Sequence, residues 1–270
     1  MGRRSSRNAV AGFSIVEIMV GMVIAMLGTI IIFQVFAVSE GIKRTTTNGA
    51  DAQQNGAMVL LALERSLKEA GYGYNAADAS AVKNPVQLTI SASAVTPDVI
   101  QVSSRTGWDY GPFLPDSAAF PSAVPPAPTV ETFSVNSNAQ LVSTINAASQ
   151  VIADGIVQMK AMYGIDETAN GSGVLQTDGV LQPSEWGGTP NNPMHVLAVA
   201  VGVVARSAQP EGKVRGDACT TTTDSPTWMG LTFDLSGNLG LAPGDSWKCY
   251  RYKTYGVIVP LRNVLWKLGS

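Results

Sequence analysis

The chain contains few of the residues from which catalytic and metal sites are usually built. Its 270 residues include one histidine, His195, and two cysteines, and only 14% are charged. One histidine makes a Cys/His zinc site implausible, and neither a Gly-x-Ser-x-Gly nor a Gly-Lys-Ser/Thr motif is present. Basic residues number 18 against 20 acidic ones, so a basic face for nucleic acid is not expected. We therefore predict no enzymatic activity, no cofactor, no metal and no nucleic-acid partner.

The most informative segment is an apolar run from Ile18 to Val38 with a carboxylate, Glu17, at its start. About 20 apolar residues span the hydrocarbon core of a bilayer. A charge near that core costs about 2.5 to 3.5 kcal/mol on insertion scales, so this carboxylate is expected to have a partner or a task. The preceding arginines, Arg3, Arg4 and Arg7, favour a cytoplasmic N-terminus by the positive-inside rule.

Two simpler interpretations of this segment stay open. A secretory signal peptide would use the same arginines as its basic region and Ala37-Val38-Ser39 as its cleavage site. Its apolar region would normally be about 7 to 15 residues long, which is shorter than this run. An ordinary membrane anchor explains the length of the run but not the carboxylate at its start.

The residues around the carboxylate resemble the N-terminus of a type IV pilin or pseudopilin precursor. They read Gly12-Phe13-Ser14-Ile15-Val16-Glu17. In that family a membrane peptidase cleaves after the glycine and methylates the new N-terminal residue, and a glutamate stands fifth in the mature chain. The resemblance implies cleavage between Gly12 and Phe13, N-methylation of Phe13, and a role for Glu17 in assembly.

Such a cleavage would give Glu17 an electrostatic task. The new ammonium group on Phe13 would lie about one helical turn from the Glu17 carboxylate. In a bundle of such helices, the carboxylate can instead meet the terminal amine of a neighbouring subunit. A medium of low dielectric strengthens this pair and makes an unpaired charge costly, so the pair would set the axial register between subunits.

Several segments further along the chain are similar to PilW-type minor pilins. They are Ala70-Gly71-Tyr72, Asp154–Val157, Tyr163–Asp166, Val204–Ser207 and Val259–Asn263. This resemblance implies a structural subunit of a type IV pilus, involved in tip formation or in priming of assembly. Its implied partners are other major and minor pilins, met through the N-terminal helix, the prepilin peptidase and an inner-membrane assembly platform. We expect the chain in the bacterial inner membrane with its globular domain in the periplasm, and then in an extracellular pilus.

Other functions stay open at this point. A J-type minor pseudopilin of a type II secretion system shares the helix and much of the fold, and genomic neighbours would distinguish it. A membrane-anchored periplasmic enzyme or binding protein predicts clustered catalytic residues or a ligand cleft, which the sequence does not offer. An adhesin presented at the tip would be compatible with the pilin interpretation.

These features predict an α+β fold of the pilin type, in which a long N-terminal helix packs on an antiparallel β-sheet domain. The expected parts are a leader at 1–12, a transmembrane or filament-core helix at 13–38, its amphipathic continuation at 39–72, and a β-rich domain at 73–270 with a proline-rich loop near 112–128. Leu60, Leu63 and Leu67 form a helical stripe that would pack the continuation onto the sheet.

Hydrophobic alternation marks strands within the expected β domain. Residues 157–163 alternate, with Gln158 and Lys160 on the polar side, which predicts a half-buried strand. The segment from His195 to Arg206 is almost continuously apolar, as in a strand covered on both faces. Further strands are expected at 86–90, 98–103, 129–135, 231–235 and 250–259, and the last two would complete the sheet.

The two cysteines, Cys219 and Cys249, lie in the part expected outside the cytoplasm, where a disulfide is the default for a pair. Closing a loop of about 31 residues would stabilise the fold by roughly 3 to 4 kcal/mol. Two free buried thiols are the alternative.

Two smaller features receive structural interpretations. The stretch Asp166–Gly171 mimics the start of a calcium loop, but Thr177 stands where a bidentate glutamate is wanted, so a turn between strands is preferred. His195 opens an apolar strand and is expected to be structural or exposed. The tryptophans near loops, and Tyr110, are expected to pack under those loops more readily than to form a contact surface.

Overall fold

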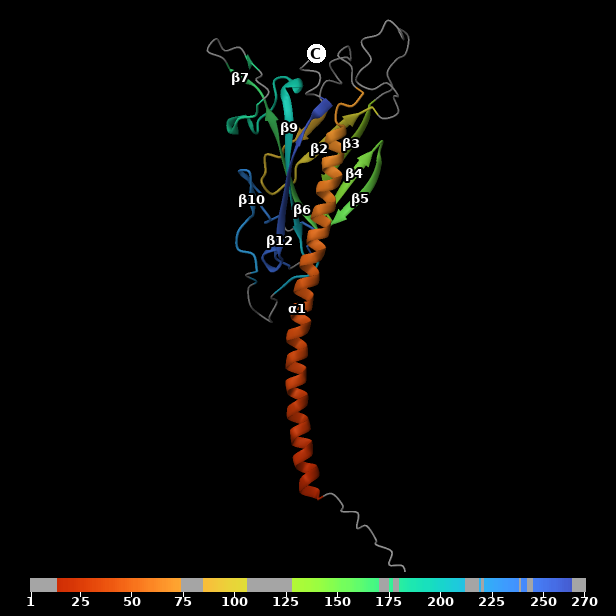
Figure 1. Ribbon diagram of the computed structural model, residues 1–270, viewed down its shortest axis with the longest axis vertical. Coiled ribbons are helices and arrows are strands. Elements are labelled where there is room, and N and C mark those ends of the chain that lie inside the picture. The colour runs from red at the N-terminus through yellow and green to blue at the C-terminus, as the bar shows by residue number, and fades with distance from the viewer. Residues whose placement is uncertain are drawn as a thin grey trace, which may run out of the picture. The chain divides into compact units, whose positions relative to one another are not determined.

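The computed structural model describes residues 14–73, 85–105, 128–169, 175–176, 180–211, 219, 221–237, 239–241 and 245–263. The chain forms two compact units, residues 1–47 and 48–270. The helix α1 (Ile15–Glu69) contributes to both units, and every described strand belongs to the second (Figure 1). The leader at 1–12 and nearly all of the proline-rich stretch, residues 112–127, lie outside the described residues.

The second unit consists of antiparallel strands that form two main sheets. The first has the order β1-β2-β3-β4-β5: β1 (Val86–Thr89), β2 (Val99–Ser104), β3 (Thr129–Val135), β4 (Gln140–Ile145) and β5 (Ala148–Asp154). The second has the order β12-β9-β6: β6 (Ile156–Ile165), β9 (Val196–Arg206) and β12 (Tyr252–Pro260). Two short ladders join β7 (Thr168–Ala169) to β8 (Leu175–Gln176) and β10 (Thr227–Trp228) to β11 (Leu231–Thr232). The short 3-10 helices are η2 (Pro183–Glu185), η3 (Pro193–His195) and η4 (Trp247–Cys249).

The part of α1 within the second unit packs on these sheets, which confirms the predicted α+β architecture. Its buried positions recur at helical spacing: Ala52, Gly56, Val59, Leu63, Leu67 and Ala70. All of them except Gly56 join one core with residues of both sheets, among them Phe133 and Val201. Of the predicted leucine stripe, Leu63 and Leu67 are fully buried and Leu60 is half-buried. Apolar burial of this kind contributes about 1.5 to 3 kcal/mol for each large side chain.

One glycine of α1 is required by the packing. A Cβ atom at Gly56 would lie 2.2 Å from the ring of Tyr255 on β12. The bare backbone of Gly56 therefore provides the space into which this ring fits, at the expense of about 1 kcal/mol of helix propensity relative to alanine.

The C-terminal end of α1 is fastened by the closing segment of the chain. Gly71 follows the helix with a φ of 73°, as expected of a helix-terminating glycine. The Asn263 side-chain amide donates hydrogen bonds to the carbonyls of Lys68, at 3.2 Å, and Ala70, at 3.0 Å. The Gly71 amide donates to the Ser103 carbonyl of β2 at 2.9 Å. Carbonyl groups that a helix end would leave unpaired are thus satisfied.

The strand β9 is buried on both faces along nearly its whole length, as predicted. On the face away from the main core, Gly202 of β9 stands opposite Gly256 of β12 in the strand register. The Trp228 ring covers this pair, because a Cβ at Gly256 would lie 2.2 Å from it. An aromatic ring over cross-strand glycines replaces the packing that the glycines lack. Trp228 is half-buried, in keeping with the expectation that the tryptophans pack under loops.

The prediction that β6 is half-buried is wrong. All ten of its residues are buried, including Gln158 and Lys160. The connection between β1 and β2, residues 90–98, covers the side that carries these two polar groups. Lys160 Nζ donates to the Asp98 carboxylate at 3.0 Å, and Gln158 Nε2 donates to the Val95 carbonyl at 2.9 Å. The polar side chains are therefore buried because a loop with matching acceptors crosses them.

Two further sequence expectations are corrected. Residues 231–235 do not extend the sheet of β9 and β12, since β11 pairs only with β10 across a turn at Met229 and Gly230. Both turn residues have positive φ, 48° and 79°, as a two-residue hairpin requires. The hairpin of β4 and β5 was not predicted. Its turn residues, Asn146 and Ala147, also have positive φ but lack the Asn-Gly pair that would reveal the turn in the sequence.

Candidate functional site

The helix of the first unit begins with a side-chain cap. The Ser14 hydroxyl accepts a hydrogen bond from the Val16 amide at 3.3 Å, and the Ser14 carbonyl accepts the first helical bond from Ile18 at 3.2 Å. Ser14 is therefore the N-cap residue, and Glu17 is the third residue of the helix. A carboxylate in the first turn is stabilised by the helix dipole. Within the described residues no group donates a hydrogen bond to the Glu17 carboxylate, and Gly12 and Phe13 lie outside them.

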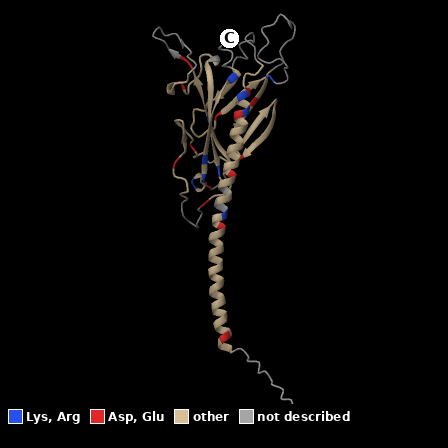
Figure 2. Cartoon of the chain, viewed as in Figure 1, with Lys and Arg blue, Asp and Glu red and all other residues tan. Residues whose placement is uncertain are grey.

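Among the described residues of the first unit, the apolar side chains of this helix are exposed. The segment Ile15–Lys43 is long and apolar enough to cross a membrane. Its large apolar side chains up to Val38 are between 46% and 78% exposed. The sequence has no charged residue between Glu17 and Glu40, and this stretch of α1 is tan in Figure 2. A continuous apolar surface of this size needs lipid or other helices to cover it.

The structure forms the predicted disulfide between Cys219 and Cys249, whose Cα atoms are 4.8 Å apart. Cys249 is buried in η4, and its carbonyl accepts a hydrogen bond from the Glu211 amide at 2.6 Å. The bridge therefore joins the segment that follows β9 to the segment that enters β12.

Removing this disulfide should lower the stability of the second unit measurably. For Cys219→Ala with Cys249→Ala, the chain-entropy argument predicts a loss of roughly 3 to 4 kcal/mol in the free energy of unfolding. Urea unfolding followed by tryptophan fluorescence measures it. The wild-type chain unfolded with a thiol reductant is the matched comparison, and equal midpoints with and without reductant would contradict the prediction.

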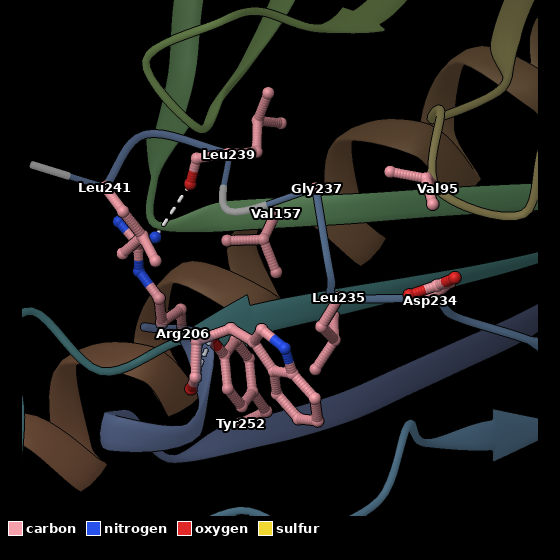
Figure 3. Close-up of a pocket in the computed structure, with 10 residues that line it drawn as sticks. Val95, Val157, Arg206, Asp234, Leu235, Gly237, Leu239, Leu241 and Tyr252 are labelled. Atoms are coloured by element: carbon pink, nitrogen blue, oxygen red, sulfur yellow. Dashed lines mark hydrogen bonds between the residues drawn. The ribbon is translucent and has the colours of Figure 1, made fainter. Parts of the chain in front are cut away.

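A small pocket lies where β9 ends and β12 begins. It is built around Arg206, whose guanidinium donates to the Leu239 carbonyl at 2.7 Å (Figure 3) and to the Gly240 carbonyl at 3.0 Å. Burial lowers the pKa of the Arg206 guanidinium and raises the pKa of the Tyr252 hydroxyl beside it. That hydroxyl donates to the Trp247 carbonyl at 3.0 Å. These groups hold loops to the sheet, so the pocket is structural. The sequence signal for it is an arginine at the end of an apolar strand.

Glu167 of the candidate calcium turn contacts His195. The Glu167 carboxylate accepts hydrogen bonds from the Asn191 side chain at 2.7 Å, the Asn192 amide at 3.1 Å and His195 Nδ1 at 3.2 Å. Burial alone would raise the pKa of Glu167, but the hydrogen bonds, led by the Asn192 amide, outweigh it and lower that pKa. Asp166 is fully buried. Among the described residues, no group of three His, Cys, Asp or Glu side chains could hold a metal; Asn170 and Gly171 lie outside them.

Comparison with known proteins gives the class to which this geometry corresponds. A family model described as type IV pilus-assembly protein W matches residues 130–263, from β3 to the residue that fastens the helix end. The type IV-like pilin from Thermus thermophilus shares 18% sequence identity over 80% of this chain and 97% of that chain, with a TM-score of 0.37. No curated protein matches the chain.

The chain thus resembles type IV pilins in its order of elements, a long apolar N-terminal helix followed by an antiparallel β domain, and residues 130–263 match the family model. Within that class the matched family is PilW, which confirms the resemblance inferred from the sequence.

Proposed function

We propose that the chain is a minor pilin, a structural subunit of a type IV pilus with a part in tip formation or in priming of assembly. The observation that carries this proposal is an exposed apolar helix with a carboxylate in its first turn, followed by a domain that matches the PilW family. Its role is structural rather than enzymatic.

In this proposal the precursor waits in the inner membrane with a cytoplasmic N-terminus, and lipid covers the apolar segment. The prepilin peptidase cleaves after Gly12 and methylates Phe13. The assembly platform then transfers the chain into a bundle of pilin helices, where side chains of neighbouring subunits replace lipid. Glu17 finds its counter-charge on a neighbour there, because an unpaired charge is costly in such surroundings.

The second unit suits this transfer. Among the residues that the structure describes, its core begins at Ala52, so this packing does not depend on whether lipid or protein surrounds the first unit. Its disulfide suits the oxidising periplasm.

The test is mass spectrometry of the mature N-terminus. The proposal predicts a chain that begins at Phe13 and carries one added methyl group. A chain that begins at Met1 would indicate a plain anchor, and one that begins at Glu40 a cleaved signal peptide. Gly12→Asp is the control, since it should retain the leader while leaving the described residues unchanged.

Deleting the gene separates the pilus role from that of a J-type pseudopilin. Loss of surface pili with normal type II secretion supports the proposal. Loss of type II secretion with normal pili would instead identify the chain as a subunit of the secretion system.

A further inference from the structure

Strand β5, the last strand of the first sheet, has backbone groups free along its outer edge (Figure 1). Its two-residue turn to β4 makes Ile145 and Ala148 a hydrogen-bonded pair. Alternation along the strand then directs the amide and carbonyl groups of Ser149 and Val151 away from β4. Within the described residues, none hydrogen-bonds to these groups. This edge is therefore open to another strand.

Strand β12 has a similar free edge in the second sheet. At one end of its ladder with β9, the Ser207 amide donates to the Arg251 carbonyl at 2.9 Å. At the other end, the Leu261 amide donates to the Leu197 carbonyl at 2.8 Å. Odd-numbered residues of this segment therefore bond to β9, and alternation directs the backbone groups of the even-numbered residues in 254–258 outward. No described residue hydrogen-bonds to those groups.

The outer edge of β1, at the other side of the first sheet, is closed instead. The Tyr163 hydroxyl of β6 accepts a hydrogen bond from the Leu88 amide at 2.7 Å and donates one to the Val86 carbonyl at 3.2 Å. Natural sheets protect an open edge with such cover, or with charged residues and prolines. The edge of β5 has no such protection in its sequence, because the residues between Glu131 and Asp154 include no charge and no proline. It is therefore suited to a partner strand.

We propose that the outer edge of β5 receives strand β12 of a second copy of this chain. The first sheet of one copy then continues into the second sheet of the next, in a head-to-tail contact. This inference rests on the proposed function, because that function places copies side by side in one membrane with their helices parallel. It adds a contact between the β domains that forms before the helices enter a filament.

The direction of the strands selects this pairing. The Glu131 carboxylate accepts hydrogen bonds from the hydroxyls of Ser66 on α1, at 2.6 Å, and of Ser143 on β4, at 2.5 Å. Ser143 stands opposite the middle of β5. At the end of β5, the Asp154 carbonyl accepts a hydrogen bond from Asn55 Nδ2 at 3.0 Å. Because Asn55 precedes Ser66, β5 runs in the direction opposite to α1.

Strand β12 runs in the same direction as α1. The ring of Tyr255 lies at Gly56. Asn263, which follows the strand, hydrogen-bonds to the carbonyls of Lys68 and Ala70. When two copies stand with parallel helices, β5 of one and β12 of the other are therefore antiparallel. Two β5 strands, or two β12 strands, would be parallel, which is the slightly weaker pairing.

Charge complementarity sets the register of the contact. The Arg206 amide donates to the Gly155 carbonyl at 2.7 Å, and Arg206 is paired with Tyr252, so Gly155 and Tyr252 lie at one level of the domain. Asp154 and Lys253, next to them on the same side, are both exposed. Copies anchored in one membrane lie level, so the contact brings Asp154 of one beside Lys253 of the other. Opposite charges on paired strands stabilise their register, and like charges destabilise it.

The same register joins the free backbone groups of the two edges. Counting along both strands from the charged pair places Val151 opposite Gly256 and Ser149 opposite Ile258. The backbone groups of all four residues point outward from their own sheets. Val151 and Ile258 are each 47% exposed in a single chain, and they become diagonal neighbours across the contact.

Cysteine cross-linking in isolated membranes tests this contact. Cells produce two differently tagged full-length chains, one with Ser149→Cys and one with Ile258→Cys, and the native cysteines are already paired. After oxidation the two chains should form a disulfide dimer. The control replaces Ser149→Cys by Ile90→Cys, because Ile90 follows β1 and is 48% exposed. A disulfide needs Cα atoms within about 7 Å, so the first pair should give at least about tenfold more dimer than the control.

Reversed charges test the register. Asp154→Lys in the Ser149→Cys chain brings two cations together and should lower the dimer yield about threefold or more. Adding Lys253→Asp to the Ile258→Cys chain restores opposite charges and should restore the yield. A folding defect in the first chain would not be repaired by this change in the other chain.

Three results would overturn the inference. They are equal yields from Ser149→Cys and Ile90→Cys, a dimer of Ser149→Cys with itself in place of the mixed dimer, and a yield that the charge reversals leave unchanged. Each leaves the proposed function intact, because removal of the leader and entry into pili are measured separately. A chain that keeps its leader would overturn the proposed function, and the cross-link would still decide whether β5 and β12 meet.

Discussion

Replacing Glu17 by alanine is expected to leave the precursor cleaved and inserted while lowering its amount in pili by at least about 30-fold. The reason is that a neighbour's cation would then be buried in the helix bundle without its partner. Removing one member of a desolvated charge pair costs about 2 kcal/mol or more, which corresponds to about 30-fold. Immunoblotting of sheared pili against the membrane pool measures the ratio directly.

Glutamine at the same position separates charge from helix capping. Ser14 and Glu17 have the spacing of a capping box, and glutamine satisfies that motif as well as glutamate does. If counter-charge is the task, Glu17→Gln should lose incorporation as Glu17→Ala does. Normal incorporation of Glu17→Gln would show that the residue acts as a helix cap. Failure of leader removal in either variant would place its role at the peptidase.

The N-terminal helix could be predicted from the sequence because its information is local. The apolar run, the helix-ending glycine at Gly71 and the leucines at 63 and 67 each follow from periodicity or composition. The burial of β9 on both faces could be predicted for the same reason, since its apolar residues are continuous. The Cys219–Cys249 bridge followed from the number of cysteines and not from any knowledge of the fold.

The rest depends on contacts between residues far apart in the sequence. The alternation of β6 predicts an exposed Lys160, because it does not reveal that residues 93–98 cover this side chain. The division into two sheets depends on strand order, which alternation along one strand does not encode. In the sequence, Asn263 is notable only as part of a segment similar to PilW-type proteins. Its hydrogen bonds to the end of α1 are seen only in the folded structure. Cleavage after Gly12 would create an ammonium group on Phe13, which lies outside the described residues. The charge partner of Glu17 therefore stays a prediction.

The largest loss of stability should come from the buried pair of Lys160 and Asp98, whose side chains are 7% and 1% exposed. Lys160 Nζ donates to Asp98, to the Thr96 carbonyl at 2.8 Å and to the Ser93 carbonyl at 3.2 Å, which uses all three of its protons. The Asp98 carboxylate also accepts from the Ser91 and Ala161 amides, at 2.9 and 3.0 Å. The pair therefore fastens the connection of β1 and β2 to β6, and so joins the two sheets.

Lys160→Met should lower the free energy of unfolding of the second unit by about 3 to 5 kcal/mol, because it leaves a buried carboxylate without a cation. Urea unfolding of the full chain in detergent, followed by tryptophan fluorescence, measures the loss. The double variant Lys160→Met with Asp98→Asn is the decisive control. It removes the uncompensated charge and keeps an oxygen that can accept an amide hydrogen bond, so it should lose less stability than Lys160→Met alone. If the double variant lost as much stability as the two single variants added together, the two side chains would act independently. The connection would then be held by its backbone contacts instead.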